Sequence, residues 1–191
     1  MLPQFQLKGN YLRQMPQALL LRLQQRAHLF QIHHKFLFLY YAPLEYKNCS
    51  HVSITDIAIQ TTYRGLRLAN CLNVSITNSS FDCVDSPSII SSRNITISNS
   101  EFIYSSPNYE NSTDCIISYS EFFRSSIYLR SSDANLISHN LLNQTQTGIY
   151  LETSSDNNLV LSNTIFYFSA CFYNSSDCVG NQWINNTCTQ I

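Results

Sequence analysis

Charged residues are scarce in this sequence, and some residue patterns that mark common functions do not occur. Only 12% of the 191 residues are Asp, Glu, Lys or Arg, about half of the ~25% found in typical soluble domains. With four Gly in all, the chain has no Gly-rich phosphate loop and no Gly-x-Ser-x-Gly nucleophile motif. No Cys-x-x-Cys pair occurs, so a zinc site has little support. The composition therefore does not point to a nucleotide-binding enzyme, a serine hydrolase or a zinc protein.

Acidic residues do not occur before Glu45, and this asymmetry is hidden in the net charge of −1. The first 44 residues carry five basic side chains, whereas the remainder carries six basic and twelve acidic ones. Phosphate binding needs a concentrated basic surface, so the mildly acidic remainder argues against a nucleic-acid partner. The five early basic residues are Lys8, Arg13, Arg22, Arg26 and Lys35.

The apolar run at residues 36–42 is too short to cross a membrane, which takes ~20 apolar residues. The stretch before it is long and has no clean leader pattern, so it does not make a clear signal peptide. We therefore expect no transmembrane span. The run is instead a degenerate first strand, or the start is misassigned and the native leader is missing.

What the sequence does contain is a repeat. Residues 43–56 align without a gap on residues 65–78, at an offset of 22 residues. The shared kernel is a polar residue, an apolar–polar–apolar triplet, Ser or Thr, and then Asn or Asp. A repeat of this length cannot bury its own apolar face, so its copies must stack on one another. The kernels begin at His51, Asn73, Asn94, Asp114, Asn135, Asn158 and, weakly, Asn181.

Alternation inside the kernel indicates strands. Val74 and Ile76 alternate with Ser75 and Thr77, which is the pattern of a strand with one buried face. The kernels are β-branched and poor in Ala, Glu and Lys, which favours strands over the helical segments of leucine-rich repeats. Parallel strands stacked ~4.8 Å apart form a β-solenoid. We therefore predict an all-β parallel β-helix over residues 43–191.

Each repeat also has apolar residues beyond the kernel. A second apolar segment precedes several kernels, as in Ser126–Leu129, Gly148–Leu151 and Cys171–Tyr173. Eight residues after most kernel starts comes another large apolar side chain, which we expect to point inward and stack on its copy in the next rung. The expected inner ladder is Ile59, Phe81, Phe102, Phe122 and Phe166.

The sequence resembles a known family in these same repeats. Kernels such as Asn73–Asn78, separated by stretches such as Gly148–Asn158, are similar to NosD-type right-handed parallel β-helix repeats of the pectate-lyase-like superfamily. The resemblance covers roughly residues 44–186. It implies a right-handed coil and an extracytoplasmic protein that handles polysaccharide or serves as a surface module. Copper handling occurs among some relatives.

The segment 1–42 is of a different kind and is expected to be a basic amphipathic extension or cap. Leu19, Leu23, Ala27 and Phe30 fall at helical spacing, with Pro16 near a first turn. Such a helix can cap the open end of a solenoid, lie on a membrane surface or serve as a leader.

Histidines also occur in this segment, at His28, His33 and His34. Imidazole binds transition metals. These three lie outside the repeats, however, and we expect no metal site there.

The seven cysteines leave at least one thiol without an intrachain disulfide partner. Cys49 and Cys71 take the same place in adjacent rungs, where a Cα separation of ~4.8 Å lies inside the disulfide range. In-register side chains point the same way, however, so a buried stack of two thiols is the alternative. Cys171, Cys178 and Cys188 are candidates for closing a C-terminal loop.

Two carboxylates form the sharpest candidate for chemistry. Glu101 and Glu121 each follow their kernel start by seven residues, so they should point outward and stack roughly ~5 Å apart. Retaining glycosidases hold their carboxylates ~5–5.5 Å apart, and such a pair also offers oxygen ligands to Ca²⁺. Arg93 and Arg124 lie near them in sequence. A solvated surface pair is the alternative. No motif matches the calcium and arginine arrangement of pectate lyases.

Tyrosines form the candidate ligand-binding row. Tyr128 and Tyr150 take corresponding places in their Ile-Tyr-Leu segments, and Tyr173 continues the series. Outward tyrosines can stack on sugar rings, although solenoid edges also carry such residues without any ligand.

We therefore predict a secreted or cell-surface β-helix module that binds carbohydrate or another surface partner and is not a catalyst. One alternative is a polysaccharide lyase or glycoside hydrolase that uses Glu101 and Glu121. Another is a structural fragment of a larger repeat protein, with end-to-end self-association. Apart from Ca²⁺, no cofactor is expected.

Overall fold

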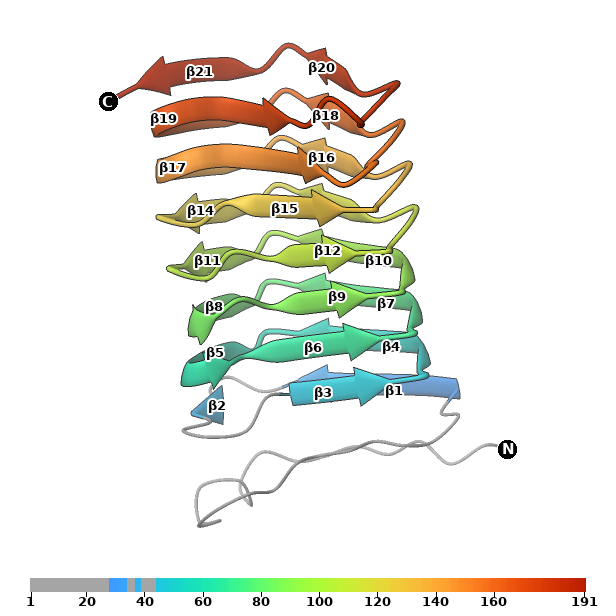
Figure 1. The fold of residues 1–191 in the computed structure, drawn as a ribbon. Coiled ribbons are helices and arrows are strands. Elements are labelled where there is room, and N and C mark those ends of the chain that lie inside the picture. Colours follow the sequence, from blue (N-terminus) through green and yellow to red (C-terminus); the bar gives the residue numbers. More distant parts are fainter. Residues whose placement is uncertain (1–27, 34–36, 39–43) are drawn as a thin grey trace.

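The computed structural model of the protein describes residues 28–33, 37–38 and 44–191, and these residues form a parallel β-solenoid. All of its strand pairs are parallel, and the described residues contain no helix. With the C-terminal end at the top of Figure 1, the chain crosses the front from left to right, returns behind and rises, which makes the coil right-handed. The predicted parallel β-helix is therefore confirmed.

The strands of successive rungs stack into three faces. The first face carries the kernel strands β1 (His28–His33), β4 (Ser50–Thr55), β7 (Leu72–Thr77), β10 (Arg93–Ser98), β13 (Ile116–Ser118), β16 (Leu136–Ser138), β18 (Leu159–Leu161) and β20 (Gln182–Ile184). The second face carries β2 (Leu37–Phe38), β5 (Ala58–Arg64), β8 (Ser80–Asp85), β11 (Glu101–Ile103), β14 (Glu121–Phe123) and β21 (Thr187–Gln190). The third face carries β3 (Leu44–Lys47), β6 (Leu66–Ala69), β9 (Ser88–Ile90), β12 (Asn108–Glu110) and β15 (Ile127–Arg130).

Two long strands pass from the second face into the third. They are β17 (Leu141–Glu152) and β19 (Thr164–Asn174), and they pair with each other along most of their length. Gly148 lies where β17 comes close to β19, because a Cβ there would sit 2.6 Å from the backbone oxygen of Cys171. The absence of a side chain at Gly148 allows both strands to bend around the same corner.

The kernel register holds across the first face, with a one-residue shift in two copies. Leu136 and Leu159 stack on Ile116. The residues that correspond to Asp114 are therefore Ala134 and Asn157, not Asn135 and Asn158. This shift turns Asn135 and Asn158 into the interior, where both are buried.

Aromatic rings fill the interior behind the second face. The rings of Phe81 and Phe102 stack with centroids 5.0 Å apart, and those of Phe102 and Phe122 with centroids 4.8 Å apart. Above Phe122 the ladder continues through Leu142 and Ile165. The expectation that Phe166 joins this ladder is wrong. The one-residue shift of the kernel start at Asn158 moves Ile165 inward, and Phe166 is only half-buried.

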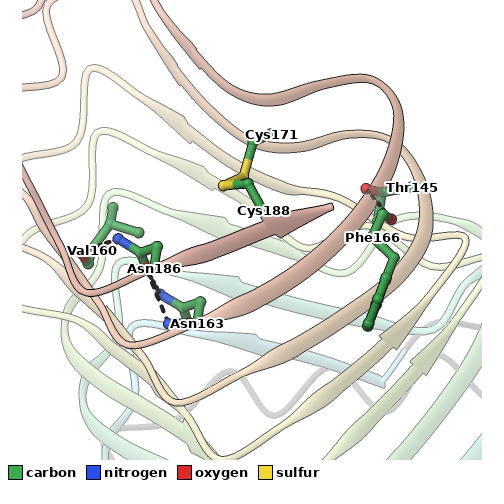
Figure 2. The surroundings of a disulfide bond; sticks show 7 residues. All are labelled: Thr145, Val160, Asn163, Phe166, Cys171, Asn186 and Cys188. Carbon is green, nitrogen blue, oxygen red and sulfur yellow. Dashed lines mark hydrogen bonds between the residues drawn. A yellow bond between two sulfur atoms is a disulfide. The ribbon is translucent and has the colours of Figure 1, made fainter. Parts of the chain in front are cut away.

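Buried amides satisfy the backbone where the chain turns from the first face to the second. Asn163 Oδ1 accepts the backbone N–H of Asn140 at 2.9 Å, and Asn163 Nδ2 donates to the carbonyl oxygen of Ile137 at 2.9 Å. Asn186 repeats both bonds one rung higher, to Asn163 and to Val160 (Figure 2). Each side chain thus pairs backbone groups that would otherwise be buried without partners.

The first described strand corrects the helix prediction. Phe30, which the helical spacing placed in an amphipathic helix, lies in β1 and pairs with Val52 of β4. Pairing with an existing parallel edge satisfies the backbone of residues 28–33, and this outweighs a weak periodicity. The helical positions before residue 28 lie outside the described residues. β1 and β2 therefore extend the solenoid into the range predicted as an extension.

One disulfide joins the last two rungs. It links Cys171 of β19 to Cys188 of β21, with Cα atoms 5.8 Å apart (Figure 2). Of the three C-terminal cysteines, Cys178 instead turns inward, where its Sγ accepts the backbone N–H of Ser155. Cys49 and Cys71 are buried in adjacent rungs as thiols, and each donates to a nearby carbonyl oxygen. The structure thus selects the thiol stack from the two arrangements considered for this pair.

Candidate functional site

The three predicted tyrosines lie in register on the third face. Tyr128 of β15 pairs with Tyr150 of β17, which pairs with Tyr173 of β19. The Tyr128 and Tyr150 rings are 4.4 Å apart and nearly parallel, whereas the Tyr150 and Tyr173 rings are 5.9 Å apart and tilted by 48°. We call Tyr128, Tyr150 and Tyr173 the tyrosine row.

Stacking determines what the tyrosine row can offer a ligand. Tyr128 and Tyr150 cover each other's facing ring surfaces, so they present ring edges and phenolic hydroxyls rather than open faces. Tyr173 tilts away from Tyr150 and is 47% exposed, so its ring can stack on a ligand. The row thus combines hydrogen-bonding hydroxyls with one aromatic platform.

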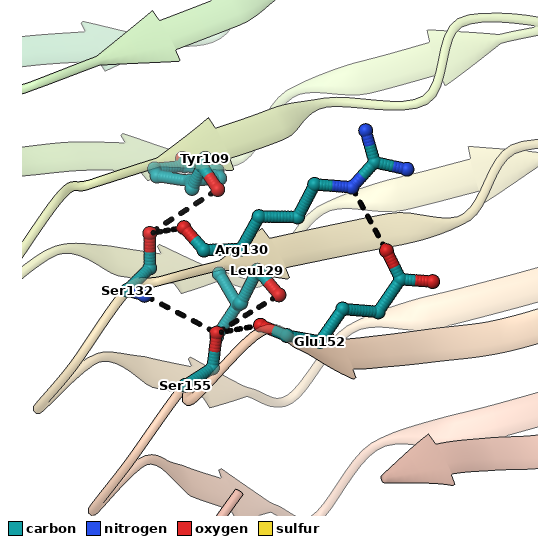
Figure 3. Close-up of polar contacts among 6 residues, drawn as sticks. All are labelled: Tyr109, Leu129, Arg130, Ser132, Glu152 and Ser155. Carbon is teal, nitrogen blue, oxygen red and sulfur yellow. Dashed lines mark hydrogen bonds and ion pairs between the residues drawn. The ribbon is translucent and has the colours of Figure 1, made fainter. Parts of the chain in front are cut away.

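Arg130 and Glu152 flank the tyrosine row on the same face. Arg130 Nε donates to Glu152 Oε2 at 2.8 Å, and the guanidinium carbon lies 5.4 Å from the centre of the Tyr128 ring. This bond uses Nε and neither of the two terminal nitrogens of Arg130 (Figure 3). Glu110 is the neighbour of Arg130 on the other side. Two acidic residues therefore flank one basic residue beside the row.

Arg130 and Glu152 were missed among the candidate residues, although the sequence carries a signal for both. Each follows its tyrosine by two positions, in Ile127–Arg130 and in Ile149–Glu152. Strand alternation puts residues two apart on one face. The same rule that selected the tyrosines therefore selects these two charges.

Buried serines hold the turn that follows this pair. Ser155 Oγ donates toward the carbonyl oxygens of Leu129 at 3.0 Å and Glu152 at 2.7 Å, and accepts the backbone N–H of Ser132 at 3.2 Å. Ser132 Oγ makes the equivalent contacts with the carbonyl oxygens of Tyr109 and Arg130 (Figure 3). These bonds fix the backbone from which Arg130 and Glu152 project.

Partial burial raises the pKa of the Tyr128 hydroxyl above its usual value, and the neighbouring Tyr150 adds to the effect. A phenol with a raised pKa is uncharged at neutral pH, where it both donates and accepts hydrogen bonds. Tyr128 therefore suits a hydroxyl-bearing ligand.

The tyrosine row is limited to three rungs. Below Tyr128 the same outward position is taken by Asn108, Ser88 and Arg67 in turn. Arg67 Nη1 pairs with Glu45 Oε1 at 2.5 Å. The N-terminal half of the third face is therefore polar and the C-terminal half aromatic.

Glu101 and Glu121 lie together, as predicted, but on the second face. They are in register on β11 and β14 and both are exposed. Ser80 Oγ donates to Glu101 Oε2 at 3.3 Å, and among the described residues neither carboxylate forms an ion pair. Their proposed role in a lyase or hydrolase stays a prediction.

The two arginines considered as partners for this carboxylate pair are engaged elsewhere. Arg93 Nε pairs with Asp114 Oδ2 at 2.7 Å on the first face. Arg124 donates from Nε to Gln144 Oε1 at 3.0 Å and from Nη1 to the Tyr104 hydroxyl at 3.1 Å. The structure therefore does not assemble the carboxylates with an arginine base.

The stacked parallel strands, which carry an aromatic row on their outer surface, define this protein as a β-solenoid repeat protein. The chain belongs to the NosD family. The family's sequence model, described as "Periplasmic copper-binding protein (NosD)", matches residues 25–191. The resemblance found in the repeats is thereby confirmed. No curated protein matches the chain. Within the described residues, no helix is long and apolar enough to span a membrane.

The described residues do not fit the copper that the family description names. No group of three or more His, Cys, Asp or Glu side chains comes together among them. Burial raises the pKa of the Cys83 thiol to about 12 and that of the Cys115 thiol to about 11. Metal ligation needs a thiolate, and such thiols stay protonated at neutral pH. The side chains of the histidine cluster at residues 28–34 lie outside those described.

Proposed function

We propose that this protein is an extracytoplasmic, non-catalytic module that binds glycan chains along its third face. The observation that carries the proposal is the tyrosine row, in which Tyr128, Tyr150 and Tyr173 repeat at the spacing of successive rungs, ~4.8 Å. A polymer with hydroxyls on every unit can engage several such positions at once. The terminal nitrogens of Arg130 and the carboxylate of Glu152 add a donor and an acceptor beside the row.

The family match and the disulfide support a location outside the cytoplasm. The family description names the periplasm. A disulfide such as Cys171–Cys188 forms and persists in an oxidising compartment, whereas the cytosol keeps thiols reduced. Both observations support the proposed placement of this chain in the periplasm or at the cell surface.

The test separates the hydroxyls from the rings. The full chain is titrated with a panel of immobilised neutral and acidic polysaccharides, and the dissociation constant is measured for each one bound. We expect the double substitution Tyr128→Phe/Tyr150→Phe to weaken binding about thirtyfold, because two lost hydrogen bonds together contribute about 2 kcal/mol. Phe preserves the ring stacking, so the solenoid should fold unchanged.

Tyr173→Ala tests the stacking platform independently, and Leu72→Ala, which truncates a similarly exposed side chain on the first face, is the matched control that should bind as the natural protein does. Full affinity in the Tyr128→Phe/Tyr150→Phe protein, or no binding to any polysaccharide of the panel, would contradict the proposal.

A further inference from the structure

The corners where each rung turns from the first face to the second follow a strict backbone rule. In all seven rungs with a described corner, the turning residue has φ between 49° and 56°. Asn, Asp and His are enriched in this left-handed conformation, and bulky residues are rare in it. Five of the seven residues are of these types: Asp56, Asn78, Asn99, His139 and Asn185.

Tyr119 is the one bulky residue among the seven, and His139 occupies the same corner one rung later. Their rings stack with centroids 4.9 Å apart and an interplanar angle of 13°. Tyr119 is 62% exposed, so its ring does not contribute to the core. The fold therefore accepts a strained backbone at Tyr119 without gaining buried area.

A second aromatic group lies where β11 and β14 of the second face end. Tyr104 and Arg124 also have positive φ, of 51° and 50°. The guanidinium of Arg124 lies 5.6 Å from the Tyr104 ring centre and 5.5 Å from that of Phe123. Tyr104 is 53% exposed. Exposed tyrosines thus lie before the start of β14, at Tyr119, and after the end of the neighbouring β11, at Tyr104.

Glu101 and Glu121 lie between these two aromatic ends. Tyr119 and Arg124 are five positions apart, which is roughly 16 Å along a strand. The two carboxylates are in register, exposed and without an ion-pair partner among the described residues. The patch therefore combines aromatic ends with a negative centre.

We propose that this patch of the second face binds a glycan that carries free amino groups. Exposed tyrosines stack on the apolar faces of sugar rings, and the central carboxylates complement an ammonium group, which aromatic rings also attract. The patch lies on a different face from the tyrosine row, so the inference goes beyond the glycan binding proposed above and can fail independently of it.

The residue preference at the corners between the first and second faces provides a test of this proposal. The double substitution Tyr119→Asn/His139→Asn installs the residue that most other rungs carry at this corner. It should leave the thermal unfolding midpoint unchanged or raise it. It should also weaken binding of a β-1,4-linked glucosamine oligomer about tenfold, as measured by calorimetry on the full chain.

Two further comparisons define the chemistry. The natural protein should bind the glucosamine oligomer about tenfold more tightly than its N-acetylated form, and Glu101→Gln/Glu121→Gln should abolish that preference. Leu72→Ala, which truncates an exposed side chain on the first face, is the control and should change neither affinity.

Three results would overturn the inference. The first is full affinity in Tyr119→Asn/His139→Asn. The second is no detectable binding of the glucosamine oligomer to the natural protein. The third is an oligolysine that binds as tightly as the glucosamine oligomer in both proteins, which would assign the patch to basic peptides instead.

Discussion

At the scale of single residues, several cysteines serve as small interior side chains. Cys71 and Ser92 occupy equivalent positions in successive rungs. Cys115 and Asn135 likewise occupy equivalent positions in successive rungs at another corner. Each is at most 2% exposed. A cysteine in such a position is a small, weakly polar filler, which agrees with the raised thiol pKa values and not with a ligand role.

The first prediction concerns the reactivity of these thiols. Only a thiolate is alkylated readily, and burial raises the pKa of Cys83 to about 12 and that of Cys115 to about 11. Both should stay unmodified by iodoacetamide at pH 8 in the folded protein and react in urea, as read by peptide mass spectrometry.

The same shifts predict a pH dependence of stability. The unfolded thiols lose their protons near pH 9.0 while the buried thiols keep theirs to about 11 and 12. The free energy of unfolding should therefore fall as pH rises from about 9 to about 12. If iodoacetamide labelled Cys83 equally in folded and unfolded protein, the assignment of Cys83 as a buried, protonated thiol would be refuted.

Residue patterns anticipated part of the site and not the rest. Strand alternation was enough to place Tyr128 and Tyr150 together on an outward face. It did not reveal that their rings would cover each other, because ring orientation depends on packing between rungs. Likewise, the pairing of Arg130 with Glu152 depends on which rungs become neighbours.

At the scale of elements, the short kernels were predicted from alternation, and their exact register was not. The alternation of Val74 and Ile76 identified a strand because only local information is needed. The shift at Asn135 and the replacement of Phe166 by Ile165 depend on how turns of different length close between rungs. The helix prediction for Phe30 failed for a related reason, because a neighbouring strand edge determined the conformation of this residue.

The second prediction tests how the rungs hold one another. Asn163→Ala removes the acceptor for the Asn140 backbone N–H and the donor to the Ile137 carbonyl, all in the buried interior. We expect a loss of about 3 kcal/mol in the free energy of unfolding, measured with urea, because buried unsatisfied groups cost ~1–3 kcal/mol each.

Asn186→Ala is the matched control for this substitution. It deletes the corresponding bonds to Asn163 and Val160 in the last rung, where Asn186 is only half-buried and water can replace them. Its cost should be about 1 kcal/mol. Equal losses in the two proteins would show that burial of the amide ladder is not the source of its contribution.

At the scale of the whole molecule, the solenoid is nearly one-dimensional. Each rung contacts mainly the rungs before and after it, so stability depends on neighbouring pairs and is weakest at the ends. Exposed large apolar side chains gather toward the C-terminal end, and the predicted end-to-end association stays a prediction. They include Phe168, Tyr173, Val179, Ile184 and Ile191.

The last prediction follows from this one-dimensional character. The Cys171–Cys188 disulfide ties β21 to β19 across a separation of 17 residues, and closing a loop of about this length is worth about 3 kcal/mol. All four residues of β21 are exposed, so this rung has little core of its own. Cys171→Ser/Cys188→Ser should therefore release the last rung while the inner rungs keep their contacts.

Hydrogen exchange read by mass spectrometry should accelerate in β20 and β21 and stay unchanged in β10 and β13. Acceleration spread evenly along the chain would mean that the solenoid unfolds as one cooperative unit, and that the disulfide stabilises all of it.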